Sequence, residues 1–391
     1  MAAVNPPMGS FIAGADRNRT FTGIRDSLYA KAVVISDGEQ TIAVVTVDCI
    51  GLLNPEIRSI QKLASAGTGI PTANIVVSST HTHAGPDVVG LWGPDPLTSG
   101  VDTAYVGFLV RTAAAQIVRA HREKSPARMT GTEGLYRGDW FANICREELD
   151  PALAVLQFKS EDGRSIATLT NFACHPTFLD THFSVVSGDY PAAFYRRMDA
   201  AQGGVNLFLQ GAIGGWVQPR DEVLASTGAS ESEEPNAFRL ADLYGTDLAD
   251  STLALLERAG EMTQPRILSK SIDFHLPVAN PNWKLLSQAG VINREVGDSV
   301  RTMMTWFAIG PAQFVTHPGE TTPWLSLQTR ALMKSGPRFV LGLSQDALGY
   351  MLKPEFFTDT TRLHSGYLTS MSLGPATTPI LLDKIRSLIP Q

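Results

Sequence analysis

The sequence predicts an α/β fold in which a mixed β-sheet core is flanked by helices and a functional site lies at the ends of strands. Short runs of β-branched and apolar residues recur along the 391 residues, and helical patterns separate many of them. Helices do not follow the later strands consistently, so we expect both parallel and antiparallel neighbours. No Pro/Gly/Ser-rich linker or internal repeat divides the chain, so residues 1–391 are treated as one domain.

The individual elements are assigned from hydrophobic periodicity and from capping residues. The predicted strands are residues 32–35, 41–47, 74–78, 152–158, 166–173, 205–210, 267–276, 313–316 and 338–343. The predicted helices are residues 54–63, 104–122, 191–201, 238–258, 324–334 and 379–389. We expect Asn54 to cap the first helix, with Pro55 at its first position, and Asp102 to cap the second.

Composition argues against several classes of protein. The chain has 32 Lys+Arg against 38 Asp+Glu and no basic run, so a nucleic-acid partner is disfavoured. It has no apolar stretch of about 18 residues, so no transmembrane segment is expected. No signal peptide is visible, so we expect a cytoplasmic protein, or a secreted one if a leader has been removed. The acidic stretch 221–236 is predicted to be a solvated loop or, as an alternative, a lid.

Two histidines, His81 and His83, alternate shortly after the apolar run 75–77. A strand places side chains i and i+2 on the same face, so we expect the two imidazoles to lie side by side at the carboxyl end of a strand. Imidazole is the commonest metal ligand in proteins and also the commonest general base. The alternative interpretation is that both are polar loop residues, one hydrogen-bonded and one solvated.

Three further polar residues, His175, Glu320 and Tyr350, each lie shortly beyond a predicted strand. If these strands share one sheet and run in the same direction, the side chains at their ends converge. Zinc is bound by imidazole nitrogen and carboxylate oxygen, and a catalytic zinc site keeps one position open for water, whose pKa falls to about 7. The segments therefore predict a metal-centred site. For Tyr350 the alternative is a buried tyrosine whose hydroxyl is satisfied locally.

Covalent catalysis is disfavoured by the motifs that the sequence lacks. Neither G-x-S-x-G nor H-E-x-x-H occurs, which argues against a serine enzyme of the α/β-hydrolase type and against a zincin protease. Cys49, Cys145 and Cys174 have no catalytic context and no C-x-x-C spacing, so we expect them to be reduced and buried. Asp48 and Asp189 could bind a second cation or have structural roles. Hydrolysis by metal-activated water is the favoured chemistry.

At these motifs the chain resembles the catalytic domain of the neutral/alkaline (non-lysosomal) ceramidase family. The similar segments occur in the same order and span most of the chain. They are residues 23–32, 47–48, 79–86, 142–146, 171–177, 187–190, 318–320 and 349–350. The motif T-H-T-H-A-G-P at 80–86, taken with the later His, Gly-Glu and Tyr segments, is specific to the superfamily and much less specific to the substrate.

The resemblance implies a set of site residues. In that family an active-site zinc is bound by two histidines, a glutamate and a tyrosine. The corresponding residues by motif are His81, His175, Glu320 and Tyr350. His83 then matches the family's catalytic histidine, with a further ligand or a supporting group as alternatives. Arg146 aligns with an arginine that contacts the reacting amide, where a guanidinium would stabilise the developing oxyanion.

Two features of the family are not found in this sequence. The segment 211–219 has no serine where the family has Gly-Asp-Val-Ser-Pro, and we expect no C-terminal immunoglobulin-like domain within residues 1–391. The leading prediction is a zinc-dependent hydrolase that cleaves the amide bond of a small-molecule N-acyl compound. The alternatives are an esterase or lactonase that uses the same site, and a non-catalytic homologue that binds a ligand through the metal.

Overall fold

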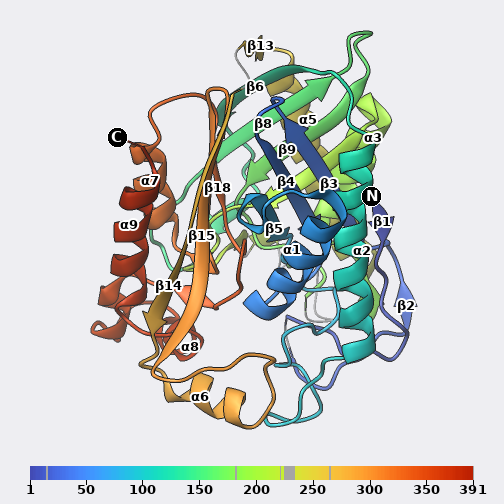
Figure 1. Cartoon of the computed structure of the whole chain (residues 1–391). Helices are drawn as coiled ribbons and strands as arrows, with labels where there is room; N and C mark the ends of the chain where they lie inside the picture. Colours follow the sequence, from blue (N-terminus) through green and yellow to red (C-terminus); the bar gives the residue numbers. More distant parts are fainter. Residues whose placement is uncertain (15, 181–182, 221, 224–233, 264–265, 391) are drawn as a thin grey trace.

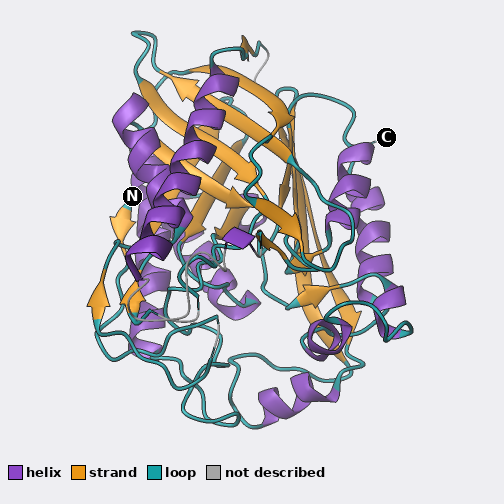
Figure 2. Ribbon diagram, turned by 180° about the vertical axis from the view of Figure 1, so that it is seen from behind, coloured by secondary structure: helices purple, strands orange, loops and turns teal. Residues whose placement is uncertain are grey.

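The computed structural model describes the chain except for residues 15, 181–182, 221, 224–233, 264–265 and 391. Sheets occupy the middle of the molecule and helices cover their outer sides (Figure 1, Figure 2). In Figure 1, α2 (Thr103–Arg122) runs along one side, and α7 (Pro323–Leu332) and α9 (Thr377–Leu388) run along the other. Parallel and antiparallel strand pairs both occur. The predicted α/β fold with a mixed core flanked by helices is therefore confirmed.

The first sheet carries the strands that lead to His81. Its spatial order is β1 (Ala2–Ala3), β3 (Tyr29–Ser36), β4 (Thr41–Val47) and β5 (Ile75–Ser79). β3 is antiparallel to both β1 and β4, whereas β5 is parallel to β4. Helices α1 (Asn54–Thr68) and α2 pack against this sheet. Because β4 and β5 run in the same direction, the segments that follow them meet at one edge.

The second sheet carries the strands on either side of His175. Its spatial order is β11 (Val205–Gln210), β9 (Ser165–Phe172), β8 (Ala152–Lys159), β6 (Arg128–Leu135) and β13 (Gly260–Glu261). Only β11 and β9 are parallel within it. Helices α3 (Tyr190–Gln202) and α5 (Glu234–Leu256) pack together over this sheet. The parallel pairing of β11 with β9 places the turn after β11 beside the turn after β9.

The third sheet carries the strands that precede Glu320 and Tyr350. Its spatial order is β14 (Ile267–Pro277), β15 (Ser299–Ile309), β16 (Ala312–Thr316) and β18 (Arg338–Leu341). β14, β15 and β16 form an antiparallel series, and β18 is parallel to β16. Helices α7 and α9 cover it. The parallel pair again brings two following turns to one edge.

Short elements complete the fold, and several of them lie at this edge. The two-stranded pairs are β2 (Gly23–Ile24) with β10 (Val185–Val186), β7 (Phe141–Asn143) with β12 (Val217–Pro219), and β17 (Glu320–Thr321) with β19 (Tyr350–Met351). The short helices are η1 (Thr72–Asn74), α6 (Pro281–Gln288), η3 (Pro354–Phe357) and α8 (Ser365–Ser370). The parallel register of β17 and β19 sets Glu320 opposite Tyr350.

One hydrophobic cluster fills the space between the three sheets. It takes Val44 from the first sheet, Leu156 from the second and Phe314 from the third, together with their neighbours. The ring of Phe314 stacks between Phe307 and Phe339, with centroid separations of 4.3 and 4.2 Å. A larger cluster joins the outer faces of the sheets to the helices. Each large apolar side chain buried in this way contributes about 1.5–3 kcal/mol, so these two cores fix how the sheets meet.

Most predicted elements are found close to their predicted limits. β4 and β11 have the limits that the sequence predicted. Asp102 caps α2, accepting two backbone hydrogen bonds at 2.9 and 3.1 Å. The predicted cap at Asn54 is wrong, because Leu53 is the N-cap of α1. The backbone N–H of Asn54 donates to Asp346 instead, a contact between distant segments that no local pattern reveals.

Two long strands were not predicted, and one loop prediction was partly wrong. β6 contains Gly131 and Gly134 and is half-exposed, so its apolar pattern is weak. β15 is recognisable mainly from its full-length pairing with β14, which is a tertiary contact. Of the acidic stretch 221–236, residues 234–236 begin α5, and residues 221 and 224–233 lie outside the described residues. The free, buried state predicted for the three cysteines is confirmed.

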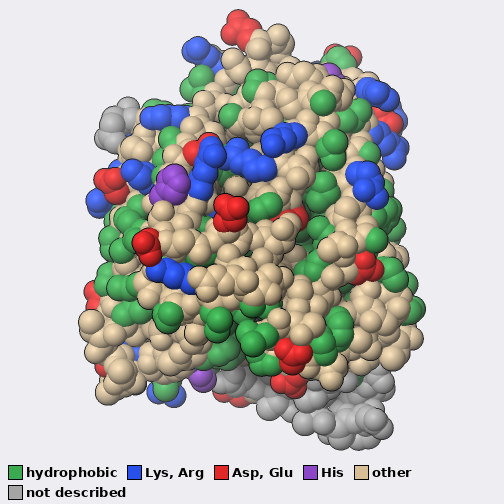
Figure 3. All heavy atoms as spheres, turned by 60° about the horizontal axis from the view of Figure 1, so that its bottom comes forward, with side chains coloured by type: hydrophobic (Ala, Val, Ile, Leu, Met, Phe, Trp, Pro, Cys, Tyr) green, Lys and Arg blue, Asp and Glu red, His purple; other side chains and the backbone are tan. Residues whose placement is uncertain are grey.

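The surface shows charges of both signs. On the face in Figure 3, where the loops at the bottom of Figure 1 come forward, hydrophobic side chains are interspersed with acidic and basic ones. Several basic side chains gather near the upper middle of this view. Among the described residues, no helix has both the length and the apolar character needed to cross a bilayer.

Candidate metal centre

His81 is held in a strained backbone conformation after β5. The strand ends at Ser79, so the two histidines lie beyond its carboxyl end, as the sequence predicted, but in a loop and not in extended strand geometry. His81 has φ +69°, a left-handed conformation that a non-glycine residue adopts when its surroundings enforce it. Its backbone N–H donates to Cys49 O at 2.9 Å. The predicted proximity of the imidazoles is nevertheless found, because the ring centroids of His81 and His83 are 4.9 Å apart.

His175 and Glu320 reach the same place from the other two sheets. His175 lies shortly beyond β9, and its backbone N–H donates to Val217 O at 2.9 Å. Glu320 opens β17, where its backbone N–H donates to Gly349 O at 2.9 Å. The centroid of the His175 ring lies 5.0 Å from that of His81 and 5.8 Å from that of His83. Segments far apart in the sequence therefore meet, as predicted.

The ring nitrogens and the carboxylate converge on one small volume. His175 Nε2 lies 3.1 Å from Glu320 Oε2, and His81 Nε2 lies 3.8 Å from the same oxygen. The Nε2 atoms of His81 and His83 are 3.3 Å apart. Among the described residues, these three histidines form the group of potential ligands in which all donor atoms lie within 4.8 Å of one another. Zinc binds such atoms at about 2.0–2.2 Å, so this spacing suits a single ion.

The outer ring nitrogens show that the inner ones are free to bind a cation. His81 Nδ1 lies 2.5 Å from Ile50 O, and His175 Nδ1 lies 2.7 Å from Val217 O. A carbonyl oxygen only accepts, so each Nδ1 carries a hydrogen, and in the neutral ring Nε2 then presents its lone pair. Metal-binding histidines commonly donate their second N–H to a carbonyl in this way. The residues present therefore fit a zinc-type ion.

Burial sets the protonation states that such an ion requires. Burial lowers the pKa of His81 to about 3, so the ring is neutral at pH 7. Burial alone would raise the pKa of Glu320, but the neighbouring histidines outweigh that effect and hold this pKa below its usual value. Neutral imidazoles and an ionised carboxylate are the forms that bind a divalent cation without first losing protons.

His83 is paired with a carboxylate that the sequence interpretation missed. His83 Nδ1 lies 2.9 Å from Asp180 Oδ1. Burial alone would lower the pKa of His83, but the charge of Asp180 and the hydrogen bond to it raise the pKa above its usual value. The loop that carries Asp180 is tethered by Arg19, which donates to the carbonyls of Asp180 and Phe183 at 2.8 Å each. The one sequence signal for Asp180 is its place in the loop after His175.

Tyr350 lies beside the carboxylate of the centre. The register of β17 and β19 sets it opposite Glu320, and its side chain is buried in a cluster with Cys145 and Phe356. Burial raises the pKa of its hydroxyl well above the usual value, so the neutral phenol is favoured at pH 7. Its ring lies 6.1 Å from that of Tyr367. A role for Tyr350 as a metal ligand stays a prediction.

Arg146 lies on an exposed loop after β7. Its φ is +57°, and its backbone N–H donates to Asn143 O at 3.0 Å. The preceding residue, Cys145, packs in the same cluster as Tyr350. Its side chain is exposed to solvent. Contact of Arg146 with a reacting amide stays a prediction.

The segment 211–219 supports the centre with its backbone. Val217 O accepts the hydrogen of His175 Nδ1, and Gly214 N–H donates to Thr321 O at 2.8 Å. A Cβ on Gly214 would lie 2.0 Å from Glu320 O, so only glycine fits against β17. In this chain the segment lacks the serine of the ceramidase motif, and its backbone supports His175 and β17.

Aromatic side chains lie beside Tyr350. Trp216, at φ +68°, has its ring centroid 4.9 Å from that of His364 and 5.5 Å from that of Tyr367. Tyr367 is half exposed. Together with Tyr350 these residues form an aromatic border on one side of the centre.

Asp48 and Asp189 each have structural partners of their own. Asp48 Oδ2 accepts from the Tyr29 backbone at 2.9 Å, and buried Lys31 is the opposite charge that acts on it. Asp189 caps α3, and its other oxygen accepts from Leu179 N at 2.9 Å. Burial raises the pKa of Asp189 to about 7. These contacts favour the structural interpretation that the sequence left open.

The α/β fold of the chain is similar to that of solved neutral ceramidases. Over 99% of its length the chain matches the neutral ceramidase of Pseudomonas aeruginosa, with a TM-score of 0.80, 17% identity and 72% of that chain covered. A ceramidase complexed with C2 gives a TM-score of 0.79 at 16% identity and is covered over 73% of its length. The resemblance predicted from the motifs is thus confirmed for the fold.

Sequence comparison agrees with the structural match. Neutral ceramidases B and A of Dictyostelium discoideum are 26% and 27% identical to the chain over 189 and 194 residues. Each match spans 43% of this chain and 26% of the relative, so the aligned part covers about a quarter of each of those proteins. No protein-family model matches the chain.

Proposed function

We propose that this domain is a zinc-dependent hydrolase that cleaves the amide bond of an N-acyl compound by metal-activated water. The observation that carries the proposal is the convergence of His81 Nε2 and His175 Nε2 on the Glu320 carboxylate, with both Nδ1 hydrogens directed to carbonyl oxygens. The ceramidases that share this fold and these motifs supply the substrate class by analogy.

The mechanism follows from what the side chains can do. His81, His175, Glu320 and Tyr350 would hold the ion. When bound, zinc polarises a carbonyl group and lowers the pKa of water to about 7. The carbonyl carbon gains the water oxygen, and the C–N bond then breaks. The leaving nitrogen must take up a proton, because an amine is a far better leaving group than its anion.

His83 is suited to move that proton. Asp180 accepts the hydrogen of His83 Nδ1, which leaves Nε2 directed at His81 and therefore at the centre. Nε2 can take a proton from water and return it to the leaving nitrogen. The exposed guanidinium of Arg146 would approach the carbonyl oxygen of the substrate and stabilise the oxyanion. The border of Trp216 and Tyr367 would accept an apolar part of the acyl compound.

The proposal is tested by metal analysis combined with a substrate panel. The purified chain should contain about one zinc per molecule and hydrolyse N-acyl amides. His83→Ala should retain the metal and lower kcat by about 10²–10⁴-fold, the usual contribution of a general acid–base group. His275→Ala, an exposed histidine on β14, is the matched control and should keep full activity.

Three outcomes would contradict the proposal. Preference for esters or lactones over every amide would assign the same site to a different reaction. A fully metal-loaded protein with no turnover on any member of the panel would indicate a ligand-binding homologue. Unchanged turnover in His83→Ala would remove this histidine from the mechanism.

A further inference from the structure

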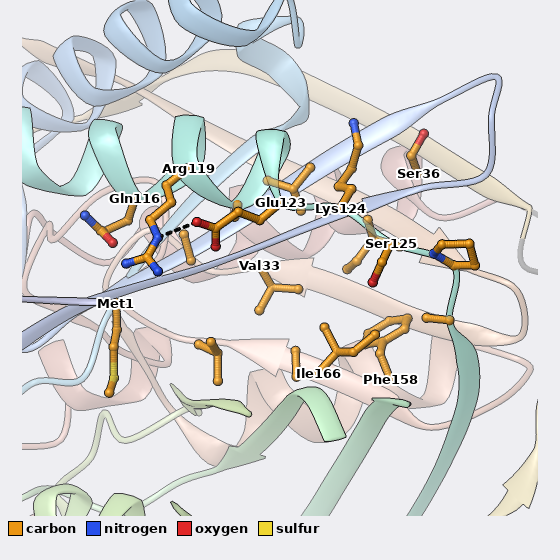
Figure 4. Close-up of a pocket in the computed structure, with 18 of the residues that line it drawn as sticks. Met1, Val33, Ser36, Gln116, Arg119, Glu123, Lys124, Ser125, Phe158 and Ile166 are labelled. Carbon is orange, nitrogen blue, oxygen red and sulfur yellow. Dashed lines mark hydrogen bonds and ion pairs between the residues drawn. The ribbon is translucent and has the colours of Figure 1, made fainter. Parts of the chain in front are cut away.

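A cavity of about 600 Å³ lies beside β3, away from the metal centre (Figure 4). Its lining includes Ser36, which pairs with Thr41 at the start of β4. The metal centre follows the opposite end, because His81 comes after β5, which runs parallel to β4. The volume lies within the range of about 300–1,000 Å³ that is typical of ligand sites. Nothing in the proposed hydrolysis uses this cavity.

The cavity lies along an edge of β3. Five consecutive residues, 32–36, line it. Successive side chains of a strand point to opposite faces, so a cavity that contacts all five must run along the edge of the strand. Among the described residues, β1 pairs with β3 only at Tyr29 and Ala30, and β4 occupies the other edge. The main chain from Lys31 onward is therefore open on this side, which makes it a template for another strand.

One wall of the cavity is apolar. Val33 belongs to the cluster between the sheets and Ile35 packs against it. Both form this wall together with Phe158, Ile166 and Val205. Figure 4 shows Val33, Phe158 and Ile166 on the same side of β3. An added strand would direct every second side chain against this wall, which favours apolar residues there.

The other wall is polar and comes from the end of α2. Arg119 Nε donates to Glu123 Oε1 at 2.9 Å, and Lys124 adds a further positive charge at the rim (Figure 4). Gln116 has its Oε1 buried without a hydrogen-bond partner, so this wall also offers an unused acceptor. Side chains of an added strand that face α2 would lie near two cations, Arg119 and Lys124, and one anion, Glu123. This excess of positive charge favours acidic residues on that face of the added strand.

We propose that the open edge of β3 binds an extended peptide segment of a partner protein as an added β-strand. The segment is about five residues long, and its side chains alternate between apolar and acidic. Main-chain hydrogen bonds supply the affinity, and the two walls supply the specificity. An acyl chain would fill the apolar wall, but it would leave the open main chain and Gln116 without partners. The proposal is independent of the hydrolase activity.

The experiment uses the full chain and a fluorescently labelled Val-Glu-Val-Glu-Val peptide whose N-terminus is acetylated and whose C-terminus is amidated. Binding of the peptide to the chain is measured by fluorescence anisotropy. Two control peptides carry N-methyl groups at the valines or at the glutamates. A strand added to an edge uses the N–H groups of alternate residues, so one of these controls should bind at least tenfold more weakly. Equal binding of all three peptides would overturn the proposal. Displacement of the peptide by laurate at similar concentration would assign the cavity to an acyl chain.

Variants of α2 locate the binding. Ala120→Trp fills the cavity and should abolish peptide binding, whereas Ala115→Trp, exposed on the same helix, should leave it unchanged. Lys124→Glu, at an exposed position, should weaken binding of the acidic peptide about threefold and improve binding of a Val-Lys-Val-Lys-Val peptide, because an exposed ion pair contributes about 0.2–1 kcal/mol. Peptide binding that is unaffected by both Ala120→Trp and Lys124→Glu would overturn the proposal.

Discussion

At the scale of single residues, the centre and the segments around it contain backbone conformations that carry no local sequence signal. His81, Arg146, Asp189 and Trp216 all have φ between +57° and +69°. A non-glycine residue held in such a conformation costs on the order of 1–3 kcal/mol, which the surrounding contacts must supply. The residue types were recognisable from motifs, but these conformations follow from tertiary contacts.

Asp180 is expected to act on catalysis through His83. In Asp180→Asn the charge that acts on His83 Nδ1 is lost while a polar group of similar size remains. We predict a 10–100-fold lower kcat, the usual effect of removing a group that orients a residue at a metal site. Steady-state kinetics checks this, with the exposed Asp162→Asn as control. An unchanged kcat would show that His83 is oriented without Asp180.

Asp189 is expected to make stability depend on pH. Burial raises its pKa to about 7 in the folded chain, against 3.8 for an ordinary carboxyl. Between pH 4 and 7 the unfolded chain releases this proton and the folded chain retains it, so the free energy of unfolding falls as pH rises. Asp189→Asn removes this contribution, and the asparagine side chain keeps an oxygen that can cap α3.

The variant should therefore gain stability relative to the wild type as pH rises, by up to about 4 kcal/mol across the window. Urea unfolding at pH 4.5 and pH 7.5 measures the difference. If the two proteins differ by the same free energy at both pH values, Asp189 ionises at an ordinary pH.

At the scale of elements, the segment after β11 forms the back of the centre. Gly214 lies against β17, and Val217 orients the His175 ring. Gly214→Ala would force a methyl group to within 2.0 Å of Glu320 O, so β17 must shift. We predict a loss of about 1–3 kcal/mol of stability, together with weaker zinc binding.

Gly260→Ala is the matched control for Gly214→Ala, because a Cβ at Gly260 meets nothing within 4 Å. It should change stability by less than about 0.5 kcal/mol. Thermal unfolding with and without added zinc separates the two effects. A Gly214→Ala protein with normal zinc affinity would show that Glu320 is not positioned by this contact.

Elements with a strong apolar period were predictable, whereas those defined by pairing were not. β4, β11 and α2 show clear patterns and were found close to their predicted limits. β6 has two glycines and a half-exposed face, and the short pair of β17 and β19 exists only through its register. Asp180 was missed for a related reason, since its partner His83 is distant in sequence.

At the scale of the whole molecule, each of the three sheets contributes one part of the centre. The parallel pairs β4–β5, β9–β11 and β16–β18 bring their following turns to one edge, and the cluster between the sheets fixes that geometry. The sequence predicted convergence at strand ends in one sheet. The structure reaches it through three sheets, an arrangement set by packing and not by local pattern.

The central claim is that His81, His175 and Glu320 hold a single zinc ion. A crystal structure of the zinc-loaded chain, with anomalous scattering measured at the zinc edge, tests it most directly. The account predicts one peak about 2.0–2.2 Å from both Nε2 atoms and from a Glu320 oxygen. A fully zinc-saturated crystal with no peak between these atoms, or with the two imidazoles turned away from each other, would contradict it.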